Sequence, residues 1–309
     1  MVVAELKFLA MASAVQVILV DPVEGAQDYA RRRLEELEQR WSRFLPESDI
    51  SRLNTAPEAF VVVSSDTIVL LNTMKHAWRL TEGRYDPSML SAINAVGYSK
   101  SIDGSNRTSR MARRPSLGHT IGDVTIDAAT SAVIVPAGLG LDPGGIGKGL
   151  AADMVVTELL DAGTGGALVG VGGDLAAAGT PPAAGGWYVA VKHPLDASRE
   201  LMTLALGVGG VATSSTLSRS WVQNGSRRHH VIDPLTRTCA TTDLAAVTVV
   251  AGAGWEAEAH ATAALLSGSG RVLDYFDSHR LDGIATTLDG ETSVSPVLER
   301  VYATEASSA

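Results

Sequence analysis

The sequence predicts an α+β protein that is built mainly from antiparallel sheets with flanking helices. Two observations lead to this class: most strand candidates follow one another directly along the chain, and the helix candidates occur singly between them. Hydrophobic residues make up 45% of the 309 residues, which provides for a sizeable core and excludes a largely disordered chain. We find no internal repeat, and we therefore expect one domain over residues 1–301 and a flexible tail at 302–309.

The first predicted element is a strand within the uncharged stretch 8–20. Val15, Val17 and Leu19 occupy alternate positions, and an Asp-Pro pair ends the run. The stretch is too short to span a bilayer, and its alternation is typical of a strand rather than of a signal peptide. We therefore expect a cytoplasmic protein without stable membrane insertion.

Two amphipathic helices are predicted next, at residues 24–41 and 65–82. In the first, apolar residues recur at steps of three or four, and charged residues occupy the other face. In the second, Ser65 is placed to cap the first turn and Gly83 to end the last turn.

Residues 100–115 carry five basic side chains against one acidic side chain and show no hydrophobic period. This composition is typical of a solvated loop or insertion. A basic patch for an acidic partner is the alternative interpretation.

The remaining predicted elements are eight short strands and two helices. Runs rich in β-branched and apolar residues indicate the strands, and the helices follow glycine-containing segments. The strands are expected at 124–126, 132–135, 167–171, 187–191, 202–206, 229–232, 246–250 and 284–288, and the helices at about 148–161 and 254–267.

The overall charge and the cysteine count exclude several classes of protein. The formal net charge is −9, whereas a protein that coats DNA or RNA is normally basic, so we expect no nucleic-acid partner. Cys239 is the only cysteine, which excludes an intrachain disulfide and Cys-rich zinc or iron–sulfur sites.

A glycine-rich loop at 141–153 is the first candidate for chemistry. Four glycines surround Lys148 directly before a predicted helix. Glycines allow the backbone to approach a ligand, and a helix N-terminus offers free N–H groups to an anion. The spacing does not match a P-loop, because Gly149 stands where that motif needs a hydroxyl side chain. A phosphate site is favoured, and a tight turn packed on a sheet is the structural alternative.

The segment 167–179 also places glycines after a strand. Its spacing fails the dinucleotide-binding fingerprint, and no helix is indicated after it. A strand–turn–strand hairpin with Gly-Gly-Asp at the turn is the simpler interpretation.

Residues 211–236 combine a hydroxyl cluster with two adjacent histidines. Thr213 begins four consecutive hydroxyl side chains, which suit a polar ligand or a turn cap. His229 and His230 are expected at the start of a strand, where they would point to opposite faces, so that one can face a cleft. A histidine near Asp233 can act as a base near neutral pH, and a structural role is the commoner alternative.

Glu258 and Thr262 lie four residues apart on the predicted helix 254–267 and therefore share one face. Both offer hard oxygen ligands of the kind that Mg²⁺ prefers. Because Mg²⁺ usually takes few protein carboxylates, phosphates at the glycine–lysine loop would complete its coordination.

Seven segments in this order resemble the motifs of the ApbE family of FAD:protein FMN transferases, over about residues 11–268. No single motif identifies the family, whereas all seven motifs in the family's order do. The matched segments are 10–13 (AMAS), 48–54 (SDISRLN), 85–88 (YDPS), 142–153 (DPGGIGKGLAAD), 170–174 (GVGGD), 230–236 (HVIDPLT) and 257–263 (AEAHATA).

The resemblance implies a reaction, a cofactor and two partners. In this family, a threonine hydroxyl of an acceptor protein attacks the FMN phosphorus of Mg²⁺-bound FAD. AMP leaves, and the FMN stays on the acceptor as a phosphoester. The resemblance therefore implies Mg²⁺ as the cofactor, FAD as the substrate, and an acceptor protein with a flavinylation threonine motif as the partner.

The resemblance also implies roles for individual residues. His230 matches the histidine that is proposed to help deprotonate the acceptor hydroxyl. The Gly145 carbonyl, the Glu258 carboxylate and the Thr262 hydroxyl match the Mg²⁺ ligands. The positions expected to contact FAD are Met11, Phe44, Arg84, Tyr85, Asp86, Asp142, Lys148, Asp153 and Thr213.

Two of these positions depart from the family's pattern. Glu258 replaces the usual Asp, and its longer side chain moves the carboxylate, which can change metal affinity and metal choice. Phe44 stands where many members have a tyrosine, and its ring can still stack on the isoalloxazine without the phenolic hydroxyl.

Two alternative functions use the same site. An FAD pyrophosphatase would use water as the nucleophile and release FMN and AMP. A non-catalytic FAD-binding protein would keep the glycine loop and lack the metal. A Ser/His/Asp hydrolase is disfavoured, because no G-x-S-x-G motif occurs.

Overall fold

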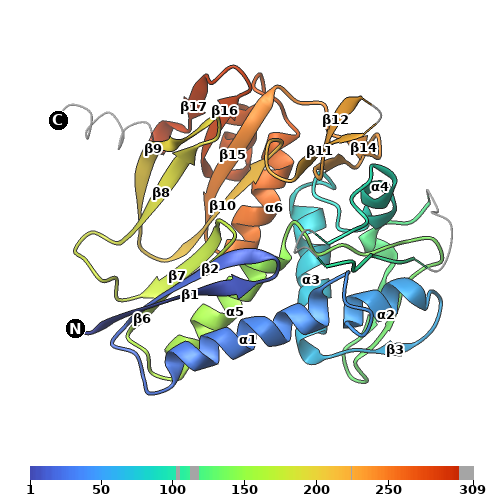
Figure 1. Cartoon of the computed structure of the whole chain (residues 1–309), viewed down its shortest axis with the longest axis horizontal. Helices are drawn as coiled ribbons and strands as arrows, with labels where there is room; N and C mark the ends of the chain where they lie inside the picture. Colours follow the sequence, from blue (N-terminus) through green and yellow to red (C-terminus); the bar gives the residue numbers. More distant parts are fainter. Residues whose placement is uncertain (102–104, 112–117, 224, 299–309) are drawn as a thin grey trace.

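The computed structural model describes residues 1–101, 105–111, 118–223 and 225–298. An eight-stranded sheet forms its centre, in the order β1-β2-β6-β7-β10-β15-β16-β17, and neighbouring strands are antiparallel throughout (Figure 1). The predicted α+β class is confirmed. The strands are β1 (Val3–Ala10), β2 (Ser13–Val20), β6 (Gly166–Val171), β7 (Asp174–Gly179), β10 (Gly209–Ser215), β15 (Leu244–Ala251), β16 (Asp282–Thr287) and β17 (Thr292–Val294).

Helices cover one face of this sheet. Val15, Val17 and Leu19 of β2 turn to this face and pack in one buried cluster with Leu34 and Val155 of the helices. The alternation that predicts a strand in the sequence is thus the alternation between the two faces of the sheet. The covering helices are α1 (Ala26–Trp41), α5 (Gly147–Asp161), α6 (Gly254–Leu265) and α7 (Val272–His279).

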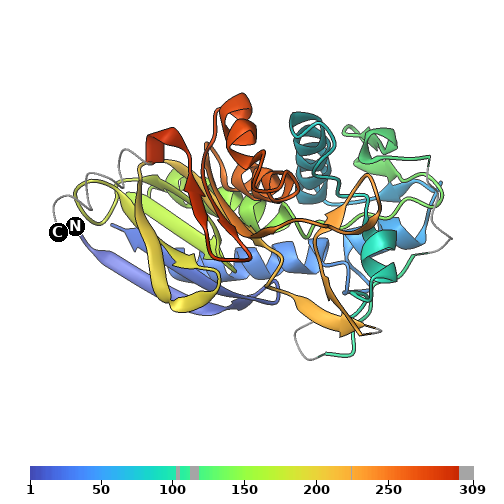
Figure 2. The ribbon, with the colours of Figure 1, turned by 90° about the horizontal axis from the view of Figure 1, so that it is seen from above.

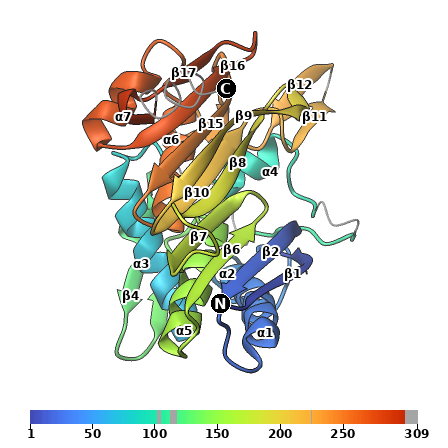
Figure 3. The same cartoon turned by 90° about the vertical axis from the view of Figure 1, so that its left-hand side faces the viewer.

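A two-stranded hairpin covers the opposite face. It consists of β8 (Trp187–His193) and β9 (Asp196–Leu206), which lie across β7 and β10 in Figure 3. Trp187 is 1% exposed and packs in one cluster with Leu168 and Val211 of the sheet. Figure 2 shows the helices and this hairpin (yellow) on opposite sides of the sheet, so the centre of the sheet is covered on both faces, whereas β1 keeps exposed side chains.

A second region of short elements lies to the right of the large sheet in Figure 1. Helix α3 (Ser65–Leu80) is its longest element, and α3 contacts both α1 and α6. The other elements are α2 (Asp49–Thr55), α4 (Leu90–Ala95), the 3-10 helix η1 (Ile121–Asp123), the three-stranded sheet β3 (Val61–Val62), β5 (Ala132–Ile134) and β4 (Thr125–Asp127), and the hairpins β11 (Ser220–Gln223) with β12 (Ser226–His229) and β13 (Ile232–Asp233) with β14 (Thr238–Cys239).

All four predicted helices are present as α1, α3, α5 and α6. The cap of α3 is Ser64 rather than Ser65, because the Ser64 hydroxyl accepts a hydrogen bond from the Thr67 N–H at 3.2 Å. Helices α2, α4 and α7 have no counterpart in the prediction, since segments of six to eight residues show too little of the helical period. None of the described helices is both long and apolar enough to cross a membrane.

One strand prediction is incomplete and another is wrong: the strand expected within 8–20 is β2, but β1 before it is not predicted. The stretch 8–20 holds parts of two strands, because the chain reverses at Met11 and Ala12 between β1 and β2. The predicted strand 229–232 does not exist as one element: β12 ends at His229, β13 begins at Ile232, and His230 lies between them. The two histidines therefore are not the alternating neighbours of one strand.

The basic segment 100–115 falls partly outside the described residues, at 102–104 and 112–117, as does the predicted tail 302–309. In its described part, Lys100 and Thr108 form an isolated bridge. Ser109 is buried, and Arg107 lines a cavity. This part is therefore more than the solvated loop that the sequence predicts. The extent of the domain, 1–301, stays a prediction.

Candidate functional site

A cavity of about 300 Å³ opens between the large sheet and the region of short elements. Loops and element ends between Met11 and Thr262 line it, so the cavity is assembled from segments that are far apart in the chain. The predicted site residues that line it are Met11, Phe44, Arg84, Tyr85, Asp86, Asp142, Gly145, Lys148, Thr213, His230, Glu258 and Thr262.

Asp153 is the predicted site residue that the cavity does not include. Its two carboxylate oxygens accept hydrogen bonds from the N–H groups of Gly254 and Trp255, at 2.8 and 2.9 Å. Asp153 of α5 therefore caps the N-terminus of α6, the helix that carries Glu258 and Thr262. Burial raises the pKa of Asp153 to about 6. The structure thus places Asp153 behind the cavity wall rather than in it.

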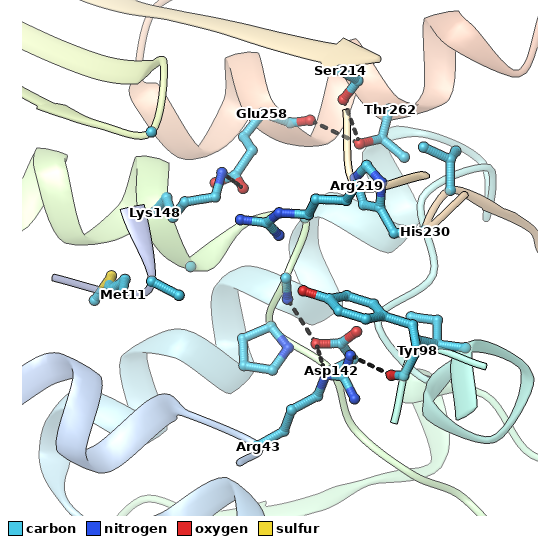
Figure 4. Close-up of a pocket in the computed structure, with 18 of the residues that line it drawn as sticks. Met11, Arg43, Tyr98, Asp142, Lys148, Ser214, Arg219, His230, Glu258 and Thr262 are labelled. Carbon is cyan, nitrogen blue, oxygen red and sulfur yellow. Dashed lines mark hydrogen bonds and ion pairs between the residues drawn. The ribbon is translucent and has the colours of Figure 1, made fainter. Parts of the chain in front are cut away.

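One end of the cavity is a buried cluster of charges (Figure 4). The Lys148 ammonium forms ion pairs with Asp174 and with Glu258, whose Oε1 lies 2.9 Å from Nζ. The other Glu258 oxygen accepts the Gly149 N–H at 2.8 Å, near the start of α5. Burial lowers the pKa of Lys148, and the negative charge of Glu258 opposes this shift. The cluster therefore fixes Lys148 at the helix N-terminus, where an anion would bind.

Asp174 is a site residue that the sequence analysis does not single out. It is the first residue of β7, directly after the Gly172-Gly173 turn, and its side chain is 5% exposed. A buried carboxylate needs a partner, and Lys148 supplies it. Two signals in the sequence mark Asp174: it is the charged residue that ends the Gly-Gly-Asp turn of an otherwise apolar hairpin, and it is the last residue of the segment 170–174 that resembles a family motif.

Two of the three predicted metal ligands, Gly145 and Thr262, lie close together at this end, and the Glu258 carboxylate points to Lys148 and the Gly149 N–H. A Cβ added to Gly145 would lie 3.7 Å from Thr262 Oγ1 and 2.9 Å from the Tyr85 ring, so only glycine fits there. Thr262 Oγ1 lies 2.9 Å from Ser214 Oγ and donates to the Glu258 backbone carbonyl at 3.3 Å. Carbonyl, hydroxyl and carboxylate oxygens fit a hard divalent cation such as Mg²⁺. Among the described residues, no cluster of three or more His, Cys, Asp or Glu side chains forms a metal site on its own.

His230 lines the same cavity and is held neutral. Burial, together with the positive charges of Arg219 and Lys148, lowers the pKa of His230 to about 3. Its Nδ1 is buried without a hydrogen-bond partner among the described residues, and so is the Tyr85 hydroxyl. Two unpaired buried polar atoms in one cavity indicate that a polar ligand completes the site.

The opposite end of the cavity is aromatic. The Arg43 guanidinium lies 4.2 Å from the centre of the Phe44 ring and 4.8 Å from the centre of the Tyr98 ring. Arg43 also pairs with Asp142, with Nε 3.3 Å from Oδ1, and donates to the Tyr98 carbonyl at 3.0 Å. The Tyr98 and Trp221 ring centres are 5.8 Å apart. Of these rings, those of Phe44 and Tyr98 line the cavity and form a wall that suits a flat conjugated ligand.

Arg43 and Tyr98 are missing from the sequence-based site. Both come from segments without a chemical motif, and the described part of the 100–115 insertion holds Arg43 in place: its Nη1 donates to Ser109 Oγ at 2.9 Å. Only the tertiary structure brings these three segments together. Arg219 is a third cavity residue that the sequence analysis does not identify.

Two hairpin turns meet beside Lys148. Met11 and Ala12 both have φ of 52°, and Gly172 and Gly173 have φ of 64° and 100°. A Cβ on Gly172 would lie 2.7 Å from Ser13 Oγ, so the turns touch. Left-handed backbone at two non-glycine residues is unfavourable, by about 1–2 kcal/mol per residue. The Met11 N–H donates to Glu38 at 2.8 Å, which holds the strained turn at the cavity.

Asp86 and Thr213 present polar groups to the cavity. Asp86 accepts from the Ser88 N–H at 2.8 Å and from its hydroxyl at 2.6 Å, and burial raises the pKa of the Asp86 carboxyl. The Thr213 hydroxyl lies 2.8 Å from that of Thr248, and the Thr213 N–H donates to Asp174. Both side chains are therefore oriented before a ligand binds.

The whole chain resembles proteins of one kind. The model of the ApbE family matches residues 11–286. FAD:protein FMN transferases from Vibrio cholerae and Haemophilus influenzae are 27% and 24% identical, and the alignments cover 81% and 80% of this chain and 75% and 74% of theirs.

Solved structures share the fold. The ApbE protein from Thermotoga maritima superimposes with a TM-score of 0.83 at 24% identity, covering 96% of this chain and 98% of its own. The flavin transferase ApbE from Vibrio cholerae gives 0.77 at 21% identity, with 97% and 99% covered. Because the family model spans nearly all of the described residues, the chain belongs to the ApbE family.

Proposed function

We propose that this protein transfers the FMN moiety of FAD to a threonine hydroxyl of an acceptor protein in a Mg²⁺-dependent reaction that releases AMP. One observation carries the proposal: Lys148, Glu258, Thr262 and His230, which come from three separate segments, line a single cavity. Relatives named FAD:protein FMN transferase support the same activity.

The charged end of the cavity suits the pyrophosphate of FAD. Lys148 supplies a positive charge at the N-terminus of α5, and the glycine loop leaves the backbone open to phosphate oxygens. Gly145, Glu258 and Thr262 would hold Mg²⁺. The bound ion would neutralise phosphate charge in a protein whose own net charge is −9.

The aromatic end suits the isoalloxazine ring. Phe44 and Tyr98 offer ring faces, and Arg43 fixes both. A ligand that spans the two ends would place its phosphates against Lys148 and its flat ring against the aromatic wall. His230 lines the same cavity, in which such a ligand would present its FMN phosphorus.

His230 is suited to accept the proton of the nucleophile. The pKa of about 3 keeps the imidazole neutral at physiological pH, so a ring nitrogen is unprotonated. The negative charge of bound phosphates would oppose the charges of Arg219 and Lys148 and make this nitrogen a stronger base. In the proposed step, the threonine oxygen forms a bond to the FMN phosphorus, and its proton passes to His230. The bond between this phosphorus and the bridging oxygen breaks, and the electron pair leaves with AMP.

The decisive experiment is one incubation of the protein with FAD, Mg²⁺ and an acceptor domain that carries the threonine motif. We expect the acceptor to gain the mass of one FMN, with an equal amount of AMP and no reaction in EDTA. The matched control is the acceptor with its threonine replaced by valine.

Two other results would contradict the proposal. FMN and AMP without a change in the acceptor's mass would indicate an FAD pyrophosphatase. FAD that is recovered intact and bound would indicate a binding protein, and restored turnover in Glu258→Asp would then assign the loss to the longer carboxylate.

A further inference from the structure

Arg219 extends into the cavity from the turn between β10 and β11 (Figure 4). Its guanidinium forms no hydrogen bond or ion pair with any of the described residues. Five acidic side chains line the cavity, and none of them contacts Arg219. Asp174 and Glu258 pair with Lys148, and Asp142 pairs with Arg43. Asp86 accepts hydrogen bonds from Ser88, and Glu38 accepts one from the Met11 N–H. Arg219 is thus a cation that the folded chain leaves without a counter-charge.

The position of Arg219 is unfavourable without a ligand. Its charge adds to that of Lys148 and lies close enough to His230 to lower the pKa of both groups. Its backbone has a φ of 48°, the left-handed conformation that side chains other than glycine disfavour. Strain and repulsion at one residue of a binding cavity indicate that the chain directs this side chain to a bound group.

An anion with several oxygens would satisfy Arg219. Guanidinium groups bind phosphate through two parallel hydrogen bonds, whereas a lysine acts as a point charge. Lys148 lies on α5 and Arg219 on the loop after β10, so the two cations approach the cavity from different elements. A phosphate between them would be held from two sides.

We propose that Arg219 is a catalytic residue that binds the phosphoryl group under attack, on the side of His230, and that it binds this group most strongly during transfer. The inference rests on the proposed function. Arg219 keeps its proton throughout: the acceptor oxygen bonds to phosphorus, its proton passes to His230, and the electron pair of the broken P–O bond leaves with AMP. Negative charge that spreads over the phosphoryl oxygens is then stabilised by the guanidinium.

The first test measures ground-state binding with a probe that needs no acceptor. Inorganic pyrophosphate is titrated by calorimetry against the wild type, Arg219→Ala and Arg227→Ala. Arg227 is an exposed residue of β12 that does not line the cavity, so it controls for the loss of one charge. We expect Arg219→Ala to weaken pyrophosphate binding by about tenfold, the scale of one charge-assisted hydrogen bond, and Arg227→Ala to leave it unchanged.

The second test measures the single-turnover rate of FMN transfer at saturating FAD. We expect Arg219→Ala to slow transfer by about 10²–10³-fold, Arg219→Lys to recover part of the rate, and added guanidinium ion to rescue Arg219→Ala. A rate loss no larger than the loss of pyrophosphate affinity would overturn the transition-state role.

The experiments also distinguish a role of Arg219 in acceptor binding from a failure of the proposed function. An Arg219→Ala variant that changes only the KM of the acceptor, with pyrophosphate binding intact, would assign Arg219 to the acceptor instead and refute the proposal. If the wild type itself transfers no FMN, the proposed function fails, and the pyrophosphate titration still decides whether Arg219 binds phosphate. Equal circular dichroism spectra exclude misfolding as the cause.

Discussion

The two ends of the cavity are built in different ways. At the charged end, Lys148, Asp174 and Glu258 stand on α5, β7 and α6, which are regular elements packed in the centre of the molecule. At the aromatic end, Phe44 and Tyr98 lie in loops beside short helices.

The difference follows from what each end has to hold. Displacement at phosphorus requires charges placed within a fraction of an ångström, and rigid elements hold side chains more precisely than loops do. A flat ring is held by area and stacking, which tolerate small shifts. We therefore expect substitutions at the charged end to be costly and substitutions at the aromatic end to be mild.

Lys148→Ala is the substitution with the largest expected effect. It leaves Asp174 and Glu258 as buried carboxylates without a cation, which we expect to lower the free energy of unfolding by about 3–5 kcal/mol. FAD binding should weaken as well. Urea denaturation and an FAD titration measure the two effects.

The matched control is Lys192→Ala on β8. Lys192 also forms an ion pair, at 2.7 Å from Glu200, but its side chain is 58% exposed. We expect a loss below about 1 kcal/mol for this pair. If Lys148→Ala and Lys192→Ala lowered the free energy of unfolding by similar amounts, the ion pairs at the charged end would be no more important for stability than an ion pair at the surface.

His230→Gln should slow FMN transfer by about 10²–10⁴-fold, the range of a general base, while FAD affinity changes little. Because the pKa of His230 is about 3, protonation of this group should cause no loss of rate between pH 5 and 8. His229→Gln is the control, since His229 does not line the cavity. Single-turnover kinetics with an unchanged rate in His230→Gln would remove it as the base.

Asp153→Asn tests the hydrogen bonds that hold the N-terminus of α6 behind the charged end of the cavity. The pKa of Asp153 in the folded chain, about 6, exceeds its ordinary value of 3.8, so folding favours the protonated form. The raised pKa contributes to the free energy of unfolding in full below pH 3.8, the ordinary pKa of the group. This contribution is lost as the pH rises through the folded-state pKa of about 6. We expect the wild type to lose stability relative to Asp153→Asn across this window.

Urea denaturation of both proteins at several pH values between 4 and 7 checks this prediction. If the free energy of unfolding changed with pH in the same way in both proteins, this result would contradict the raised pKa of Asp153. Asn keeps one of the two oxygens that cap α6, so we also expect a pH-independent loss of about 1 kcal/mol.

Phe44→Tyr has the smallest expected effect. The added hydroxyl lies at the aromatic end, where the ring face does the binding, so FAD affinity should change by no more than about 0.5 kcal/mol. Phe44→Ala removes the ring and should weaken binding by about 0.5–1.5 kcal/mol. Fluorescence titration with FAD measures both, and a larger effect for Phe44→Tyr than for Phe44→Ala would reverse the comparison.

The sequence predicts the four longest helices and many of the strands because their signals are local. Leu34 and Leu37 repeat at the helical period in α1, and Val15 and Val17 alternate in β2. The prediction misses β10, whose Gly-Gly start and Ser-Ser end resemble a turn, although its neighbours β7 and β15 supply its hydrogen bonds. Tertiary pairing overrides propensity there.

The sequence by itself determined the fold class, the glycine–lysine loop and the spacing of Glu258 and Thr262, because these depend on residues that are neighbours along the chain or on one helix. Only the tertiary structure decided that Asp174 neutralises Lys148, that Arg43 joins Phe44 to Tyr98, and that Asp153 supports the site from outside it. These contacts join residues that are distant in sequence. Their partners are chosen by burial, since a charge removed from water must find an opposite charge wherever the fold supplies one.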